Sequence, residues 1–92
     1  MAWVYILKCS DGSYYTGSAI DLEKRLAEHN TGTFDGYTAK RLPVKLIFAY
    51  ETSTIHDAFL RERQIKGWSR RKKEALINGE WNKLVEYSKS KE

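Results

Sequence analysis

The chain has 92 residues, of which 41% are hydrophobic and 13% aromatic, a composition that predicts one packed domain rather than disorder. Its formal net charge of +4 suits an anionic partner, and equally fits a surface of solvated lysines. One cysteine, Cys9, excludes a disulfide or a cysteine-based zinc site within one chain and indicates a reducing compartment. The opening residues lack a basic n-region, and no apolar run approaches ~18 residues, so we expect a cytoplasmic chain without signal peptide or membrane span.

The first thirty residues predict a hairpin followed by a helix. β-branched and aromatic residues at 2–9 predict a strand, the turn signal SDG follows, and 13–18 predict the second strand of the hairpin. Asp21 is a good N-cap for a helix that ends near Asn30, because its side chain can accept from an amide of the first turn.

A third strand and a second helix follow a polar, glycine-containing loop, TGTFDGYTAKR. Residues 44–51 predict the strand. Ser53 or Thr54 caps the helix, which ends near Lys66, and Asp57 completes a capping box on Thr54.

Two shorter helices are expected after the second one. Ser69 caps a helix that runs to about Ile77, and NGEWNKLVEY adds a short fourth. The order β-β-α-β-α-α predicts an α+β, sandwich-like fold in which helices flank a small three-stranded, mainly antiparallel sheet. We expect residues 1–80 to form this domain and 81–92 to form a helical extension with a frayed tail.

The loop of the hairpin decides which side chains share a face. With a two-residue turn, Tyr5 and Tyr15 point to opposite faces. With a three-residue loop closed by a left-handed Gly12, Tyr5 faces Gly17, and Tyr5 and Tyr15 become diagonal neighbours on one face. Gly12 suits the longer loop because glycine tolerates a positive φ, and Gly17 would leave space opposite Tyr5. Tyr14 then faces the other way, and an ordinary amphipathic core also explains the tyrosines.

Charged and polar side chains interrupt the apolar stripes of the first two helices. Glu62 lies in the middle of a stripe of the second helix, with Ile55, Ala58, Phe59 and Ile65. A buried carboxylate must be paired, neutralised or bound to a metal, and a salt bridge is the ordinary explanation. On the first helix, Arg25 and His29 lie at the edge of the stripe formed by Leu22 and Leu26, where a snorkelling arginine and a structural histidine are the ordinary explanation.

Basic residues gather in the loop and in the later helices, interleaved with Tyr37 and Trp68. Such a set predicts a phosphate-binding surface, although a solvated helix face is a commoner reason for it. The members that we expect to contact nucleic acid are Lys40, Arg41, Arg61, Lys66, Arg70 and Arg71.

The order and spacing of these residues resemble the GIY-YIG nuclease domain, above all its small stand-alone bacterial members, over roughly residues 2–78. The segment WVY, which ends at Tyr5, is similar to the first family motif, and YTG, which begins at Tyr15, is similar to the second. Arg25 and His29 match the arginine and histidine of the family's first helix, and Glu62 matches its metal-binding glutamate. Trp3, Thr16 and Ser18 depart from the common family pattern.

The resemblance implies a metal-dependent endonuclease that hydrolyses phosphodiester bonds in DNA, with RNA not excluded, and a role in repair or recombination. Glu62 would hold one Mg²⁺ or Mn²⁺, and Arg25 would stabilise the phosphorane-like state. Either Tyr5 or His29 would act as general base, and Tyr15 would orient the water or the phosphate.

Two other functions stay open at this point. One is a nucleic-acid-binding module of the same fold without catalysis, which the basic run favours. The other is a protein-interaction domain with Trp68 and Trp81 as anchors. We expect a monomer or a weak homodimer, and a partner protein is one source of substrate choice.

Overall fold

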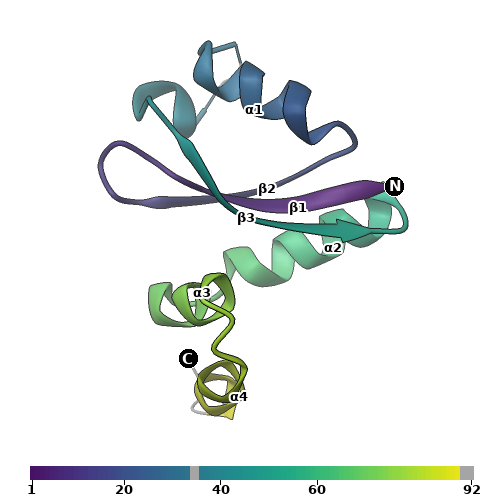
Figure 1. Ribbon diagram of the computed structural model, residues 1–92, viewed down its shortest axis with the longest axis vertical. Coiled ribbons are helices and arrows are strands. Elements are labelled where there is room, and N and C mark those ends of the chain that lie inside the picture. The colour runs from purple at the N-terminus through teal and green to yellow at the C-terminus, as the bar shows by residue number, and fades with distance from the viewer. Residues whose placement is uncertain (34–35, 90–92) are drawn as a thin grey trace.

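Three strands form one antiparallel sheet with helices on both of its faces (Figure 1). The computed structural model describes residues 1–33 and 36–89. The strand order is β2-β1-β3, so β1 is central, and the expected α+β fold with a small antiparallel sheet is confirmed. The elements are β1 (Ala2–Lys8), β2 (Tyr14–Ala19), α1 (Leu22–Asn30), the 3₁₀ helix η1 (Thr38–Lys40), β3 (Lys45–Thr52), α2 (Ile55–Lys66), α3 (Arg70–Ile77) and α4 (Trp81–Lys89).

The hairpin between β1 and β2 has the three-residue loop that puts both tyrosines on one face. The amide of Cys9 donates to the carbonyl of Ser13 at 2.8 Å, and Gly12 adopts a φ of +84°. In the resulting register Tyr5 pairs with Gly17. The prediction from Gly12 is therefore confirmed, because a two-residue turn would have shifted the register and separated the rings.

Each of the first three α-helices begins at an expected capping residue. The side chain of Asp21 accepts from the amide of Lys24, Thr54 accepts from Asp57, and Ser69 accepts from Lys72. Of the two candidate caps for α2, Thr54 is therefore the one used. The loop that precedes β3 was expected to be irregular, but it contains η1, which the sequence pattern did not predict.

The two faces of the sheet bury different kinds of side chain. Toward α2 the core is aliphatic, and it consists of Ala2, Val4, Ile6, Ala58 and Ile65. Toward α1 the core contains Tyr5, Leu7, Cys9, Ala19 and Val44, against which Leu22 and Leu26 pack. This division follows from the alternation of side chains along β1, because successive residues of a strand point to opposite faces.

The predicted apolar stripe of α2 is too wide. Ala58, Glu62 and Ile65 are buried, but Ile55 is 44% exposed and Phe59 is 47% exposed. The reason is the narrowness of a three-stranded sheet: Ile55 lies beyond the end of β2, where it lines a cavity together with Ser18 and other residues.

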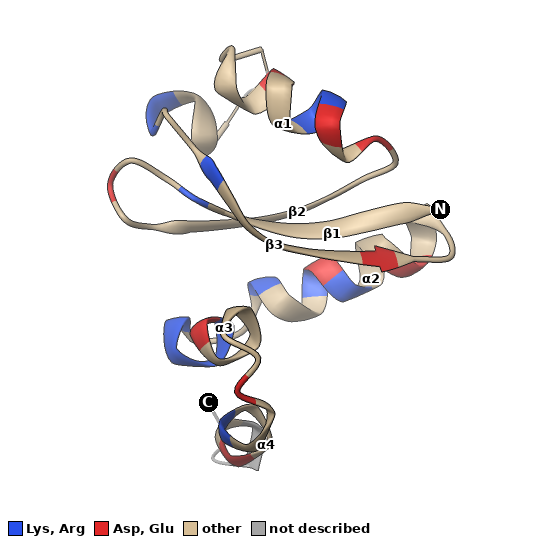
Figure 2. Ribbon diagram, viewed as in Figure 1, with Lys and Arg blue, Asp and Glu red and all other residues tan. Residues whose placement is uncertain are grey.

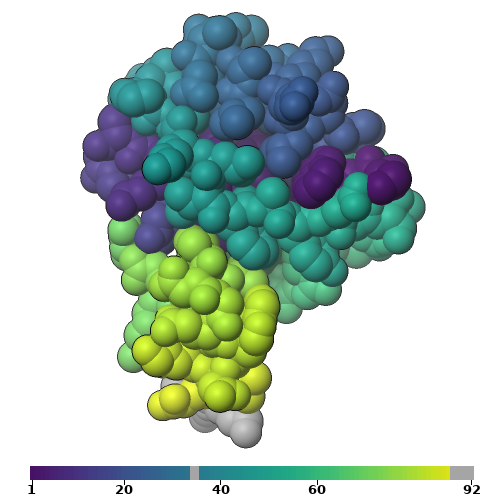
Figure 3. Space-filling view, in the orientation of Figure 1, coloured from purple at the N-terminus to yellow at the C-terminus, as the bar shows by residue number. Residues whose placement is uncertain are grey.

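The C-terminal helices extend away from the sheet, as the yellow-green lobe of Figure 3 shows. Trp68 packs against the aliphatic core, whereas Trp81 is 59% exposed on α4. Residues 81–89 form the expected fourth helix, and the rest of the expected frayed tail lies outside the described residues. The division into a domain at 1–80 and an extension at 81–92 stays a prediction. Among the described residues no helix is both long and apolar enough to span a bilayer.

Candidate active site

Tyr5, Tyr15 and His29 form a compact aromatic cluster between the sheet and α1. The Tyr5 hydroxyl lies 2.8 Å from His29 Nε2. The ring centroids of Tyr5 and Tyr15 are 6.4 Å apart, and those of Tyr15 and His29 are 5.2 Å apart. Tyr5 is 1% exposed and His29 is 0% exposed, so the expectation that His29 stands at the edge of the core is wrong. The buried imidazole is tolerated because both ring nitrogens have hydrogen-bond partners.

The second partner of His29 comes from η1. Thr38 Oγ1 lies 2.7 Å from His29 Nδ1, and Thr38 is 1% exposed. No sequence signal indicates this contact, since a threonine in a polar loop has no periodic pattern that would mark it as buried.

The segment that carries Thr38 is fastened to the hairpin and to the aromatic cluster. The ring of Tyr37 stacks on Tyr15 with 6.3 Å between centroids, and the Arg41 guanidinium lies 3.8 Å from the centroid of Tyr37. Arg41 also donates to the carboxylate of Asp11 in the hairpin loop at 3.0 Å. The hairpin loop and the η1 segment, which are far apart in sequence, are therefore in contact with each other beside the cluster.

Gly17 makes the close approach of Tyr5 possible. A Cβ atom at Gly17 would lie 2.5 Å from the Tyr5 hydroxyl oxygen and 3.0 Å from a ring carbon of Tyr15. The space expected opposite Tyr5 is thus present, and it is filled by the hydroxyl end of Tyr5 itself. Because the Gly17 backbone is held in the β-ladder, any larger residue would displace the tyrosine.

Burial keeps the Tyr5–His29 pair uncharged. It raises the pKa of Tyr5 to about 12, helped by the neighbouring Tyr15, and opposed by a hydrogen bond and the charge of Arg25. Burial also lowers the pKa of His29, and the charge of Arg25 adds to that effect while Glu28 opposes it. A neutral phenol and a neutral imidazole at hydrogen-bonding distance can exchange a proton without a change in total charge.

Arg25 lies at the rim of the cluster. Its Nη1 donates to the carbonyl of Ser18 at 3.1 Å, and its Nε pairs with Glu28 at 3.3 Å. Its side chain is 32% exposed, and it lines a cavity of ≈ 440 Å³ beside Ser18 and Lys24. A guanidinium in this position can bind a phosphate at the cavity while remaining next to Tyr5.

Glu62 reaches the same region from α2, on the other side of the sheet. It is 9% exposed, its Oε2 pairs with Lys66 Nζ at 2.7 Å, and its Oε1 accepts from the Ser18 hydroxyl at 2.5 Å. The ammonium of Lys66 also lies 5.6 Å from the ring centroid of Tyr15. The salt bridge expected for a buried carboxylate is therefore present, and it lies where the two faces meet, at the open edge of β2.

Near β2, one carboxylate, that of Glu62, is placed to hold a metal ion. Within residues 1–33 and 36–89 no three His, Cys, Asp or Glu side chains gather in a way that would enclose a metal. Mg²⁺ is commonly held through one or two carboxylates while substrate phosphates and waters complete its shell. Glu62 fits that role because the Lys66 ammonium already shows that a cation is stable at its Oε2 atom.

The basic residues expected to contact nucleic acid lie in or next to η1 and in helices α2 and α3, where Figure 2 shows blue segments. Their contacts divide them into two groups. Three have ring contacts near the start of β2: Arg70 is 4.2 Å from the ring centroid of Tyr14, Lys66 is near Tyr15, and Arg41 covers Tyr37, which stacks on Tyr15. Lys40 follows in η1, and Arg71 lies over Tyr87 on the α3–α4 side. Lys66 and Arg70 therefore lie beside β2, the edge strand that also carries Ser18, whereas Arg71 lies beside α4.

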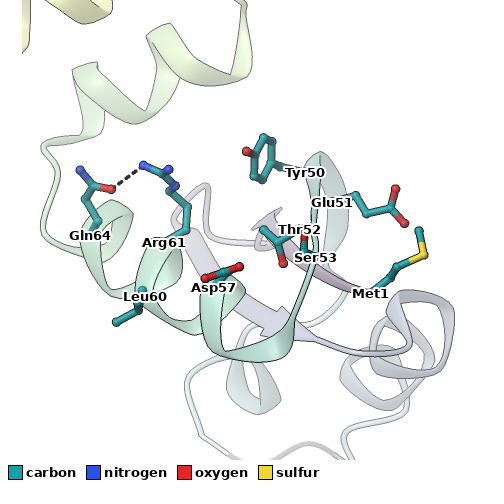
Figure 4. Close-up of a pocket in the computed structure, with 9 residues that line it drawn as sticks. All are labelled: Met1, Tyr50, Glu51, Thr52, Ser53, Asp57, Leu60, Arg61 and Gln64. Atoms are coloured by element: carbon teal, nitrogen blue, oxygen red, sulfur yellow. Dashed lines mark hydrogen bonds between the residues drawn. The ribbon is translucent and has the colours of Figure 1, made fainter.

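Arg61 belongs to the other group, on the opposite flank of α2. It lines a cavity of ≈ 610 Å³ along β3 and donates to Gln64 at 2.8 Å (Figure 4). This cavity is larger than the one at Arg25, but none of the five candidate catalytic side chains lines it. Of the five, Arg25 lines the smaller cavity, together with Ser18, whose hydroxyl donates to Glu62. We therefore place the candidate site beside the smaller cavity.

Comparison with known proteins identifies the family of the chain. Residues 1–75 match the GIY-YIG catalytic domain. A UPF0213 protein of Staphylococcus saprophyticus is 47% identical over 76 residues, which cover 83% of this chain and 93% of that protein. A UPF0213 protein of Halobacterium salinarum is 46% identical over 77 residues, covering 84% of this chain and 100% of that protein.

Two solved structures share the fold. The solution NMR structure of a UPF0213 protein from Bacillus halodurans is 39% identical with a TM-score of 0.55, covering 85% of this chain and 84% of that one. A solution NMR structure from E. faecalis is 37% identical with a TM-score of 0.57, covering 84% and 82%. The chain belongs to the GIY-YIG family, a nuclease family, and is similar to its small UPF0213 members.

Proposed function

We propose that this chain is a metal-dependent endonuclease that hydrolyses phosphodiester bonds in DNA. The observation that carries the proposal is the placement of two unlike sets of groups on either side of β2. The buried Tyr5–His29 pair packs against Gly17 on one side, and the Glu62 carboxylate accepts from Ser18 on the other. Single-stranded, branched or damaged DNA are the substrates we favour, in the cytoplasm and in repair or recombination.

Glu62 is the side chain that would hold one Mg²⁺ or Mn²⁺ in exchange for Lys66. Such an ion supplies positive charge to the phosphate oxygens and acidifies a bound water. The Ser18 hydroxyl, which donates to Glu62, orients the carboxylate for that task.

Tyr5 and His29 are proposed to act together on the attacking water. A pKa of about 12 makes a preformed Tyr5 phenolate scarce at neutral pH. Tyr5 therefore accepts the proton of the water while its own proton passes over the 2.8 Å hydrogen bond to His29 Nε2. Tyr15 orients the water or the phosphate beside them.

Arg25 is proposed to bind the scissile phosphate. Its guanidinium is the exposed neighbour of the buried Tyr5, and it gives charge to the crowded phosphate of the transition state.

The nucleic acid is proposed to run along β2. Cations are spaced along that strand from Arg70 at its start, through Lys66 and Arg41, to Arg25 at its end. Lys40 and Arg71 extend this row of positive charge on either side.

Cleavage of labelled single-stranded and branched DNA with Mn²⁺ tests the proposal. Glu62→Gln should lower the single-turnover rate roughly 10²- to 10³-fold while DNA binding persists. Glu51→Gln, an exposed carboxylate on β3, is the matched control and should cut like the wild type. Equal rates for the wild type and Glu62→Gln would refute the assignment of Glu62.

A second function deserves the same assay because the row of cations also fits binding alone. A nucleic-acid-binding module of this fold would bind DNA with a strong salt dependence and cut none of it with any divalent metal. Salt-dependent binding without turnover would favour this second function over the endonuclease.

A further inference from the structure

Thr38 is a buried polar residue that the proposed reaction has not yet used. It is 1% exposed, and its hydroxyl oxygen lies 2.7 Å from Nδ1 of His29. His29 faces Tyr5 through its other nitrogen, so the three side chains form one chain of hydrogen bonds from η1 through α1 to β1.

Two arrangements of protons satisfy these distances. In the first, His29 Nδ1–H donates to Thr38, and the Tyr5 hydroxyl donates to the Nε2 lone pair. In the second, Thr38 donates to Nδ1, and Nε2–H donates to the Tyr5 oxygen. Only the first gives His29 a lone pair that can receive the Tyr5 proton.

Burial of the Tyr5 hydroxyl distinguishes the two arrangements. Tyr5 is 1% exposed, and its hydroxyl is hydrogen-bonded to His29 Nε2. In the second arrangement the Tyr5 oxygen accepts from Nε2–H, so the buried phenol proton loses this nitrogen as its acceptor. In the first arrangement the phenol proton is donated to the Nε2 lone pair, so the one donor of the hydroxyl is satisfied.

We propose that Thr38 is a positioning residue that holds His29 in the Nδ1–H tautomer, with the Nε2 lone pair directed at the Tyr5 hydroxyl. The catalytic consequence rests on the nuclease function proposed above, whereas the tautomer does not. Thr38 acts only through His29, since its hydroxyl lies on the side of the imidazole ring that faces away from Tyr5.

The proton balance of the step is complete with these groups. The O–H bond of the attacking water breaks as its oxygen bonds to phosphorus, and a new O–H bond forms on Tyr5. The former Tyr5 O–H bond breaks and an N–H bond forms at His29 Nε2, while the leaving oxygen departs from phosphorus with its electron pair. Thr38 accepts from Nδ1–H before and after the transfer, so it also stabilises the imidazolium that results.

The tautomer can be measured without any substrate. In protein labelled with ¹⁵N in its two histidines, the ring nitrogen shifts distinguish Nδ1–H from Nε2–H, and His56→Gln assigns the remaining signals to His29. We expect Nδ1–H in the wild type and in Thr38→Ser, and a shift toward Nε2–H in Thr38→Val. A wild-type Nε2–H signal, or the same tautomer in wild type and Thr38→Val, overturns the proposal.

Cleavage rates then connect the tautomer to catalysis. Thr38→Val should lower kcat roughly 10²-fold with KM unchanged, and Thr38→Ser should restore most of it. Equal kcat for wild type and Thr38→Val overturns the catalytic role. If the wild type cuts no DNA although the Nδ1–H signal is present, the proposed nuclease function fails and the assignment of the tautomer stands.

The groups that face His29 and would influence these measurements come from every element around it. They are Tyr5 of β1, Tyr15 of β2, Arg25 and Glu28 of α1, and Thr38 of η1. None of them is changed in the Thr38 series except Thr38 itself, so a change of tautomer is attributable to the lost hydroxyl.

Discussion

The two faces of the sheet are built from the same central strand, yet they differ in chemistry. Toward α2, Val4 and Ile6 lie in a cluster of buried aliphatic side chains, against which rings such as Phe48 and Trp68 pack. Toward α1, Tyr5 packs beside His29 and Thr38 in a chain of hydrogen bonds that is almost wholly buried. The alternation of one strand therefore separates a face that stabilises the domain from a face that carries polar chemistry.

This difference explains why the candidate site lies at the edge of β2. A buried polar cluster is accessible to substrate only where the sheet ends, and Ser18 on that edge links the cluster side to Glu62 on the other side. The aliphatic face holds α2 in position, so the carboxylate and the tyrosine–histidine pair meet around one strand.

On the polar face of the sheet, we expect Gly17→Ala to cause the largest loss of stability and of cleavage activity. The added methyl group would lie 2.5 Å from the Tyr5 hydroxyl, so Tyr5 must move away from His29. We expect a loss of roughly 1–3 kcal/mol in the free energy of unfolding, together with most of the cleavage activity. Chemical denaturation and single-turnover cleavage measure the two effects.

Gly67→Ala is the matched control for that substitution. Gly67 follows α2 at a φ of −80°, and an added Cβ atom would be 3.6 Å from the nearest non-adjacent atom, the carbonyl oxygen of Gln64, which is an ordinary contact. It should leave stability and cleavage close to those of the wild type. A Gly17→Ala protein as active as Gly67→Ala would contradict the close packing inferred at Tyr5.

The pH dependence of stability should be the next largest effect. Burial lowers the pKa of His29 below its usual 6.5, so the unfolded chain binds this proton first as the pH falls. The free energy of unfolding should therefore decrease as the pH drops below about 6.5, through the lowered pKa of the folded state. Thermal melts from pH 7.5 to pH 5 should show a smaller slope for His29→Gln than for the wild type.

The exposed His56 supplies the control for that slope, because it lies in the first turn of α2 and away from the cluster. His56→Gln should retain the wild-type pH dependence. The same slope in His29→Gln and in the wild type would mean that His29 takes up its proton as readily in the folded protein as in the unfolded chain.

The smallest expected effect is on DNA binding, and it separates the basic residues beside β2 from Arg61 on the β3 side. Arg70→Ala should weaken DNA binding and reduce the magnitude of the log K against log[salt] slope by ~0.7, the value for one phosphate on a single strand. Arg61→Ala should leave that slope unchanged, because Arg61 lines the cavity on the β3 side. Fluorescence anisotropy in the Glu62→Gln background, which should not cut, measures both; a larger change for Arg61→Ala would contradict the path along β2.

Local signals in the sequence predicted the parts of the fold that local physics decides. Gly12 predicted the three-residue loop and therefore the shared face of Tyr5 and Tyr15, since a left-handed residue closes such a loop. Asp21 and Ser69 predicted helix starts because each satisfies an amide of the first turn. Glu62 was expected to be buried, and it is.

Non-local arrangements could not be predicted in the same way. Periodicity indicates which residues share one side of α2, but not how wide a surface lies under them, so Ile55 and Phe59 were wrongly expected in the core. No pattern connects Thr38 to His29, because their contact depends on how the η1 segment packs over the sheet. The approach of Glu62 from the opposite face likewise follows from the strand order, which puts β2 at the edge.

The most direct test compares two neighbours in the sequence that point to opposite faces, Tyr5 and Ile6. Tyr5→Phe should abolish most of the single-turnover cleavage of DNA while the free energy of unfolding falls by only about 1–3 kcal/mol, the cost of a buried partner left unpaired. Ile6→Ala should lose about 2–5 kcal/mol of stability and retain the cleavage rate at temperatures where it is folded. Cleavage that survives in Tyr5→Phe, or that disappears from folded Ile6→Ala, would contradict the division of roles between the two faces.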